Sequence, residues 1–236
     1  ALRMRFPALP PRPARTTGLL EDTRAGFRWI LSRRPFRWLL AVGALANFTF
    51  APLLLLLPLL ARDRVAADAA RLGLPFEEVF AIAHMAGGAG GVLGGVLVSA
   101  WGLPRVRRTL IMAGCLATLG LGEVLAGAAT TVWALAVAMF VGELLVAPLN
   151  TASYTLWQSL TPSHMLARAL STRRFIAQGA FPLGTAVSGW VATRLDPWVV
   201  VLGAGVLLML GVLVQVTRPG FATLEDRMRE AAQQAD

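Results

Sequence analysis

A row of polar side chains follows one face of an otherwise apolar segment between residues 132 and 158. Glu143, Asn150, Tyr154 and Gln158 form the row, with Ala147 at the remaining step, and each step is three or four residues, as on one helix face. Acidic groups inside membrane segments serve as proton relays or substrate contacts. We therefore expect Glu143, Asn150 and Tyr154 to carry protons or to contact a substrate. A structural hydrogen bond from Glu143 to a neighbouring helix is the alternative.

Four further polar side chains interrupt apolar segments of the chain: Asn47, His84, Glu123 and Gln178. Glu123 lies nearer the end of its segment than Glu143 and is a second candidate for proton coupling or substrate binding. Histidine is the side chain that changes charge near neutral pH, so His84 is a third candidate, and a packed or water-facing histidine is the alternative. Asn47 and Gln178 would line a cavity or join neighbouring helices.

The elements that must position these residues are six long apolar segments. Hydrophobic residues make up 56% of the chain and charged residues 15%, whereas about a quarter of a soluble domain is charged. The segments reach the roughly 20 residues that a membrane-spanning helix needs, and their apolar runs are continuous, unlike the alternating strands of a barrel. The expected fold class is therefore all-α, a polytopic membrane protein whose bundle occupies residues 36–217. Its six transmembrane helices are expected at 36–61, 77–101, 107–128, 132–157, 172–193 and 197–217.

The basic residues indicate on which side of the membrane each loop lies. All 22 are arginines, and 18 of them fall in segments that share one side of a six-span topology. The other side holds Arg62, Arg64, Arg71 and Arg194. Because basic residues accumulate in cytoplasmic loops, both ends of the chain are expected in the cytoplasm, with the bundle in the cell (inner) membrane. Arginines that alternate with membrane spans form no continuous basic face, so no nucleic acid partner is expected.

Residues 1–35 are expected to form a cytoplasmic connector with an amphipathic helix, and residues 218–236 a cytoplasmic C-terminal tail. In the connector, Leu20, Phe27 and either Ile30 or Leu31 recur at helical spacing. Such a helix would lie in the membrane interface, and a solvated linker is the alternative. We expect the connector to continue from a preceding part of a longer protein.

The single cysteine, Cys115, lies within the third expected span. An intrachain disulfide needs two cysteines, and a cysteine-based zinc site needs several ligands at close spacing. We therefore expect no disulfide, no metal site and no cofactor.

The second expected span contains the glycine-rich stretch GGAGGVLGG, from Gly87 to Gly95. A phosphate-binding glycine loop follows a strand in a soluble fold, whereas this stretch lies inside an apolar segment. Gly87, Gly91 and Gly95 recur every four residues, as do Gly90 and Gly94, so each series would let a neighbouring helix approach closely. The stretch is therefore predicted to be a helix-packing surface.

Glycines and prolines in other spans indicate further close packing and bending. Gly184 and Gly189 are predicted packing positions of the fifth span. Proline interrupts the hydrogen bonds of a helix, so kinks are expected at Pro52, Pro58 and Pro148.

Two stretches of the chain resemble a known family. They are VLVSAWGLPRVRRTL at 96–110 and LNTASYTLWQSLTPSHMLARALSTRRFIAQGAFPLG at 149–184. Both are similar to the carboxy-terminal half of a major facilitator superfamily exporter, in the branch of macrolide-efflux and enterobactin-exporter-like proteins. The second stretch matches the family's pattern after its tenth span at Gln158, Thr161, Pro162, Arg168 and Ser171.

The chain departs from this family at two places. Ala167 stands where a glycine usually precedes the arginine, and Ser99 and Ala100 replace an acid and an arginine in the first stretch. The second departure argues against a charge-relay gate in that loop. Six arginines remain as gating candidates of the cytoplasmic loops: Arg105, Arg107, Arg108, Arg168, Arg173 and Arg174.

The resemblance implies a twelve-helix fold of two six-helix halves, each built from two inverted three-span repeats. One half is present here, so the expected partner is a missing N-terminal six-helix half. The resemblance also implies export of a small molecule, such as a drug, a macrolide or a siderophore-like compound, bound between the halves. We expect proton antiport with alternating access, with protons and the lipid bilayer as further partners.

Two other classes of function match parts of the sequence. Ser188 and Gly189 are adjacent, as in an intramembrane serine protease, but Ala186 replaces the expected glycine and no histidine follows Ser188. Because a nucleophilic serine needs a base within reach, we expect no enzyme activity and no catalytic residues. A non-transporting membrane scaffold or a regulatory half-transporter is the remaining alternative, and an upstream reading frame with six more spans would argue against it.

Overall fold

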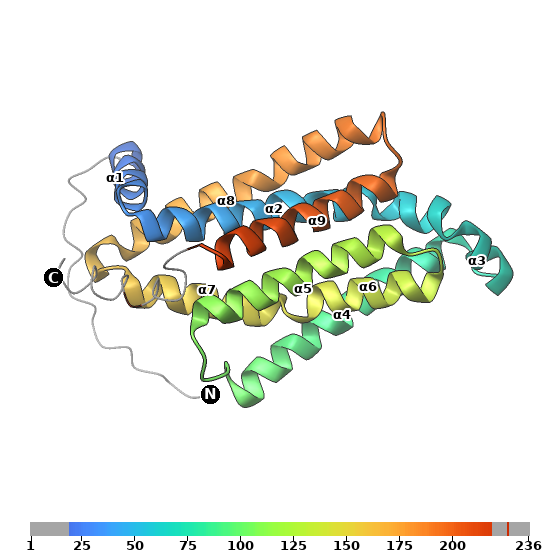
Figure 1. The fold of residues 1–236 in the computed structure, drawn as a ribbon, viewed down its shortest axis with the longest axis horizontal. Helices are drawn as coiled ribbons and strands as arrows, with labels where there is room; N and C mark the ends of the chain where they lie inside the picture. The colour runs from blue at the N-terminus through green and yellow to red at the C-terminus, as the bar shows by residue number, and fades with distance from the viewer. Residues whose placement is uncertain (1–18, 219–225, 227–236) are drawn as a thin grey trace, which may run out of the picture.

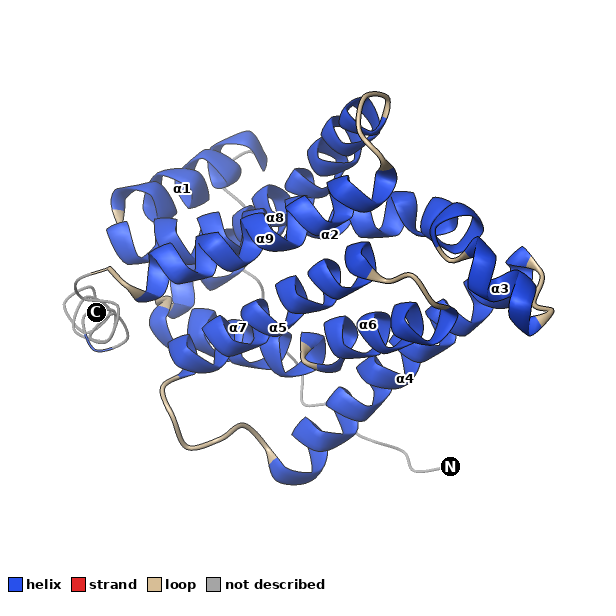
Figure 2. Ribbon diagram, turned by 45° about the vertical axis from the view of Figure 1, so that its right-hand side comes forward, coloured by secondary structure: helices blue, strands red, loops and turns tan. Residues whose placement is uncertain are grey.

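The computed structural model of this chain describes residues 19–218 and residue 226. Within these residues every regular element is helical, as Figure 2 shows, which confirms the all-α class. The elements are α1 (Leu19–Ser32), α2 (Arg34–Leu59), the π-helix η1 (Leu60–Arg64), α3 (Ala66–Leu72), α4 (Phe76–Trp101), α5 (Arg108–Ala128), α6 (Val132–Leu144), α7 (Val146–Leu160), α8 (Ser163–Ala192) and α9 (Pro197–Val216). The long helices lie side by side, with α1 and α3 at opposite ends of the bundle (Figure 1).

Five membrane spans are present among the described residues by length and apolar composition. They are α2 with η1, α4, α5, α6 with α7, and α9. These match five of the six predicted segments. The sixth segment, residues 172–193, forms the second part of α8, a 30-residue helix. Polar side chains such as Gln178 and Ser188 make α8 less apolar than the other spans.

In chain order the long helices form two groups of three. The first group is α2, α4 and α5, and the second is the α6–α7 span, α8 and α9. The α2 helix packs against α8 and α9, the α6–α7 span packs against α4 and α5, and α5 packs against α9. The first span of each group therefore contacts the second and third spans of the other group. This reciprocal pattern is the one that two inverted three-span repeats produce.

The fourth span is interrupted near its middle. Helices α6 and α7 are separated by Leu145, whose φ is −101° and ψ is 10°. Pro148 accounts for the break because it has no backbone N–H for the carbonyl of Leu144, and its ring would clash with that carbonyl in a regular helix. The kink predicted at Pro148 is thereby confirmed, whereas α2 continues as one helix through Pro52 and Pro58.

Glycines of α4 bring its backbone against the α6–α7 span. A Cβ atom placed on Gly90 would lie 3.1 Å from the carbonyl carbon of Phe140. A Cβ placed on Gly94 would lie 2.9 Å from the carbonyl carbon of Leu144, at the end of α6. Real Cβ atoms do not fit at such distances from a fixed backbone, so glycine at both positions permits the contact.

Of the two predicted glycine series, Gly90 and Gly94 lie on this contact, whereas the series of Gly87, Gly91 and Gly95 leaves it after Gly87. Gly87 lies on the contact, 3.5 Å from a side-chain atom of Glu143 when a Cβ is added, but Gly91 and Gly95 have no described atom within 4 Å. A step of four residues turns about 40° beyond a full helical turn, so the series drifts off the contact. Steps of three and then four, through Gly90 and Gly94, stay on it.

Two glycines of α8 contact α2 to different degrees. A Cβ placed on Gly184 would lie 2.9 Å from the Cβ of Ala51, which is too close for two carbon atoms. A Cβ placed on Gly189 would lie 3.7 Å from the side chain of Leu55, an ordinary contact. Gly184 is therefore the position at which the two helices approach most closely.

The predicted amphipathic helix is present as α1. Of the two alternatives for its apolar face, Ile30 is fully buried and Leu31 is half exposed. A Cβ placed on Gly26 would lie 2.8 Å from the carbonyl oxygen of Arg168, so α1 is docked on α8. The side chain of Leu20, residues 1–18 of the connector, and residues 219–225 and 227–236 of the tail lie outside the described part.

Candidate functional site

Glu143 lies in the last turn of α6, directly before the interruption of the fourth span. It is about 16 Å along the helix from Val132, which places it near the middle of the span. Its side chain is half-buried, and its Cγ atom lies 3.5 Å from a Cβ placed on Gly87 of α4. Transporters place interrupted helices at their binding sites because the break frees backbone groups inside the membrane. Glu143 is thus a half-buried acid next to irregular backbone.

Beyond the interruption, the predicted row continues along α7 as exposed side chains. Asn150, Tyr154 and Gln158 are all exposed, and Tyr154 has 44% of its surface accessible. Polar groups in a membrane span face a protein interior or a water-filled cavity, since lipid chains offer no hydrogen bonds. The exposed face of α7 therefore has the character of a cavity wall.

Arg173 of α8 joins this wall. Its Nη2 atom donates a hydrogen bond to the hydroxyl of Ser153 over 2.8 Å. The guanidinium also lies over the ring of Tyr154, 4.5 Å from the centroid, and 5.7 Å from that of Trp157. The sequence pointed to Tyr154 as a substrate contact and to Arg173 as a loop gating residue, and the structure brings the two into one group.

Helices α7 and α8 contain no acidic residue, and α8 contains three arginines. Between Glu143 and Asp196 the sequence contains arginines but no acidic residue. This absence is visible in the sequence and could have identified the region as a positive surface. The pairing of Arg173 with Tyr154 could not be inferred, because the two residues are on different helices.

The other predicted polar residues make mostly local contacts. Asn47 donates to a carbonyl of its own helix over 2.8 Å, so this bond does not join two helices. Gln178 accepts a hydrogen bond from Arg174 over 3.3 Å. His84 is exposed, and its ring meets Phe80 edge-on with 4.4 Å between centroids.

Arginines of the loop between α4 and α5 lie apart from the Arg173 group. Arg107 forms an ion pair with Asp226 at 3.0 Å, and Arg108 contacts the hydroxyl of Ser159 at 3.5 Å. Arg105 is exposed. Among the gating candidates, Arg107 and Arg108 therefore contact other segments of the chain near this loop, whereas Arg173 lies inside the bundle.

Glu123 is the more buried of the two candidate acids. Its exposed fraction is 0%, and neither carboxyl oxygen has a hydrogen-bond partner among the described residues. A Cβ placed on Gly205 of α9 would lie 2.8 Å from the Cβ of Glu123, so the side chain begins in the contact between α5 and α9.

Asp68 has a structural role that sequence reasoning missed. Its carboxylate accepts a hydrogen bond from the backbone N–H of Val132 over 2.9 Å and pairs with Arg71. It thereby caps the first turn of α6 from α3 and fixes the beginning of the interrupted span. The spacing of Asp68 and Arg71 suits a helical ion pair, but nothing in the sequence reveals the contact with α6.

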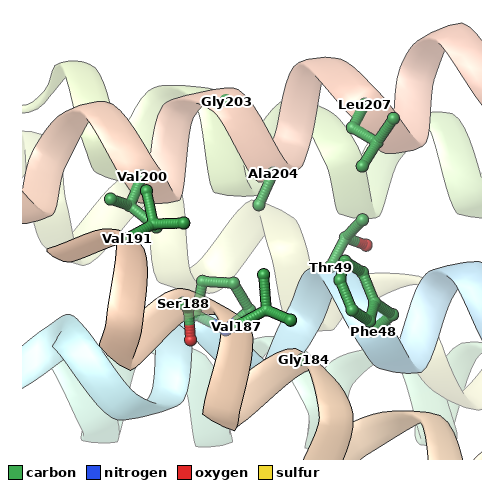
Figure 3. A pocket seen from close by; sticks show the side chains of 11 residues that line it. Phe48, Thr49, Gly184, Val187, Ser188, Val191, Val200, Gly203, Ala204 and Leu207 are labelled. Atoms are coloured by element: carbon green, nitrogen blue, oxygen red, sulfur yellow. The ribbon is translucent and has the colours of Figure 1, made fainter. Parts of the chain in front are cut away.

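A cavity of about 140 Å³ lies between α2, α8 and α9 (Figure 3). Its walls include Phe48, Val187, Val191 and Leu207, and its polar side chains are Thr49 and Ser188. Both hydroxyls donate to carbonyls of their own helices, over 3.3 and 3.1 Å. The cavity is therefore apolar in character and separate from the exposed face of α7.

Comparison with known proteins gives two matches. A family model described as transmembrane secretion effector matches residues 1–232. An uncharacterized MFS-type transporter of Sinorhizobium fredii, y4rN, is 26% identical over 217 residues, covering 91% of this chain and 51% of the relative. The chain thus spans about half the length of that relative. No solved structure matches the chain.

Proposed function

Because this chain belongs to the transmembrane secretion effector family of the major facilitator superfamily, we propose that it forms the C-terminal half of a proton-coupled exporter of small molecules. Its partner in this proposal is an N-terminal six-helix half, and the substrate binds between the two. The observation that supports the proposal most directly is the position of Glu143. This half-buried acid lies at the interruption of the fourth span, in line with the exposed polar face of α7.

Proton entry and substrate export are coupled if Glu143 either binds a proton or contacts the substrate. A neutral carboxyl group can pass through an apolar environment, whereas a charged and unpaired one cannot do so cheaply. The cavity therefore reorients with a proton bound or with substrate bound, but not when Glu143 is charged and alone. Proton entry from outside then drives the substrate out.

The group around Arg173 completes the proposed cavity wall. Tyr154 offers a half-exposed aromatic ring, and Asn150 and Gln158 offer hydrogen-bonding groups on the same face. Arg173 holds the Tyr154 ring in place from α8. Such a surface suits an amphipathic small molecule with both ring and polar groups, such as a macrolide or a catecholate.

The test uses the full-length transporter that contains this chain, expressed in cells without competing efflux pumps. Export of a macrolide, a catecholate siderophore and a cationic dye is measured with and without a protonophore. We expect export of at least one compound, and we expect the protonophore to abolish it.

Glu143→Gln should abolish gradient-driven export while leaving binding of the same compound measurable. Glu78→Gln, at an exposed acid where α4 begins, is the matched control and should export at the parental rate. Parental export by Glu143→Gln would exclude Glu143 as the proton carrier, and no export of any compound would argue against an exporter.

We also propose that the loops at the α1 end of the bundle face the cytoplasm, because the sequence segments predicted on that side contain 18 of the 22 arginines. Cysteines introduced at Ala66 and at Pro104, both exposed, lie on opposite sides of the membrane in this orientation. An impermeant thiol reagent should label the Ala66 and Thr131 positions from outside in intact cells, and the Pro104 position only after lysis. The reverse labelling pattern would overturn the orientation.

A further inference from the structure

Two glycine–glutamate pairs occur where α5 crosses α6. Gly122 precedes Glu123 on α5, and Gly142 precedes Glu143 on α6. A Cβ placed on Gly122 would lie 2.7 Å from the backbone nitrogen of Gly142, so the two helices touch at these glycines. Each glutamate is thus one residue away from the same backbone contact.

The two carboxyl groups leave this crossing toward different neighbours. Glu143 extends along α4 at Gly87 and is half-buried. Glu123 begins against Gly205 of α9 and is fully enclosed, with both oxygens unpartnered within the described residues. The proposed function uses Glu143 and leaves the enclosed acid without a role.

No positive group faces Glu123 from the elements packed on α5. Within α9 the sequence has no charged residue and no histidine, and the part of α2 from residue 38 to residue 59 has none either. The α6 helix carries only Glu143, and α7 carries Tyr154 as its single ionisable side chain. On α5 itself the ionisable groups are Arg108, at the other end of the helix, and Cys115.

The chemistry of this position selects a proton as the ligand. A carboxylate without a partner is unstable in an enclosed apolar site, whereas the neutral acid is tolerated. Hard metal cations take about six oxygen ligands, and a single carboxyl group supplies two. The described residues also contain no group of three or more His, Cys, Asp or Glu side chains that could hold a metal.

We propose that Glu123 is a second proton-binding site of the exporter, and that its proton exchanges only when α5 separates from α6 and α9 at their glycine contacts. This inference rests on the proposed function. Glu143 then exchanges its proton with the cavity, and Glu123 exchanges its own during the reorientation of the helices. Each cycle carries one proton inward on each acid, two in total, for each substrate molecule exported.

The first experiment needs no substrate. Infrared spectra of the full-length protein in lipid at neutral pH are recorded for the parent, Glu123→Gln, Glu143→Gln and Glu78→Gln. A carbonyl band of a neutral carboxylic acid should be present in the parent, weaker in Glu123→Gln by the contribution of this one group, and unchanged in Glu78→Gln. Should Glu123→Gln fail to fold, Glu143→Gln protein must still show the band, since it keeps Glu123. A parent spectrum unchanged by Glu123→Gln, or no band in Glu143→Gln, would overturn the assignment.

The second experiment measures the substrate gradient that the protein can sustain. Proteoliposomes with the membrane potential clamped at zero receive a tenfold proton gradient and whichever of the three test compounds is exported. Two protons per cycle limit the substrate gradient to about 100-fold and one proton limits it to about 10-fold, if the substrate is neutral. Glu123→Gln should lower the limit of the substrate gradient from about 100-fold to about 10-fold.

A parental limit in Glu123→Gln would overturn the second site even if Glu143 is confirmed. Loss of all active export in Glu123→Gln, with parental coupling in Glu143→Gln, would support the Glu123 site and refute the proposed role of Glu143.

Discussion

The crossing of α5 with its neighbours and the gap between α7 and α8 both hold ionisable side chains, yet the helices meet by different means. At the crossing, glycine backbones of α5, α6 and α9 touch, and Glu123 is enclosed. Between α7 and α8 the backbones barely touch, and Arg173 spans the gap with a hydrogen bond and ring contacts while Tyr154 stays exposed. Backbone contacts resist displacement, whereas contacts through a long side chain allow it.

This difference suggests that two parts of the bundle have different mechanical roles. Glycine contacts hold helices α5, α6 and α9 together, and in the proposed cycle these contacts open only for the step in which Glu123 exchanges its proton. The α7 and α8 helices form a face that can change its spacing during the transport cycle, as alternating access requires. The following substitutions test whether this division is correct.

The largest effect is expected for Gly122→Ala in α5. The added methyl group would overlap the backbone of Gly142, and α5 cannot retreat because α9 packs on its other side. We expect a loss of about 1–3 kcal/mol of stability, as for other overpacked cores. The measurement is the unfolding midpoint of the full-length protein in one detergent.

Gly114→Ala supplies the matched control on the same helix. Gly114 is exposed, and no described atom lies within 4 Å of a Cβ placed there. Because alanine is the better helix former, this change should raise stability by roughly 0.5–1 kcal/mol. Equal effects of Gly122→Ala and Gly114→Ala would contradict a locked crossing.

A smaller loss is expected for Gly94→Ala in α4. Its methyl group would overlap the carbonyl of Leu144, but α4 packs on one side only and can shift outward. We expect a loss of about 1 kcal/mol, the low end for overpacking. Gly95→Ala, one residue along and free of close contacts within the described part, should not lower stability. A loss at Gly95 equal to that at Gly94 would favour the predicted series of Gly87, Gly91 and Gly95 over the observed contact through Gly90 and Gly94.

The smallest effect on stability is expected for Arg173→Ala. The change removes one hydrogen bond and two cation–π contacts, worth about 1 kcal/mol together when partly exposed to solvent. Arg174→Ala, at an exposed arginine that donates a hydrogen bond to Gln178, should change stability by less than about 0.5 kcal/mol. Export should suffer more than stability in Arg173→Ala, because the α7–α8 face would lose the bridge from Arg173 to Ser153 and Tyr154. If the two arginine variants export equally well, Arg173 does not position the cavity wall.

Much of the fold follows from local properties of the sequence. Five spans match apolar segments of sufficient length, because hydrocarbon forces the backbone of each segment into its own hydrogen bonds. The break near Glu143 follows from Pro148, since the missing N–H and the ring clash act within four residues. The sixth predicted segment is helical as part of α8, but it is not among the five apolar spans, because Gln178 and Ser188 lower its apolar character.

The candidate site was predictable in part. Glu143, Asn150 and Tyr154 were identified because their spacing places polar groups on one face of an apolar helix, and the structure does leave Asn150 and Tyr154 exposed. The sequence did not reveal that Arg173 lies over Tyr154, because nothing local relates residues on two different helices.

The sequence alone determined where the helices lie, where one of them breaks and which face of it is polar, because each of these depends on neighbours within a few residues. Tertiary structure decided which glycines touch, since only the position of the partner helix selects Gly90 and Gly94 over Gly91 and Gly95. It also decided that Glu123 is enclosed while Glu143 stays half-buried. Burial is set by the helices that surround a residue, and both glutamates follow a glycine in equally apolar sequence.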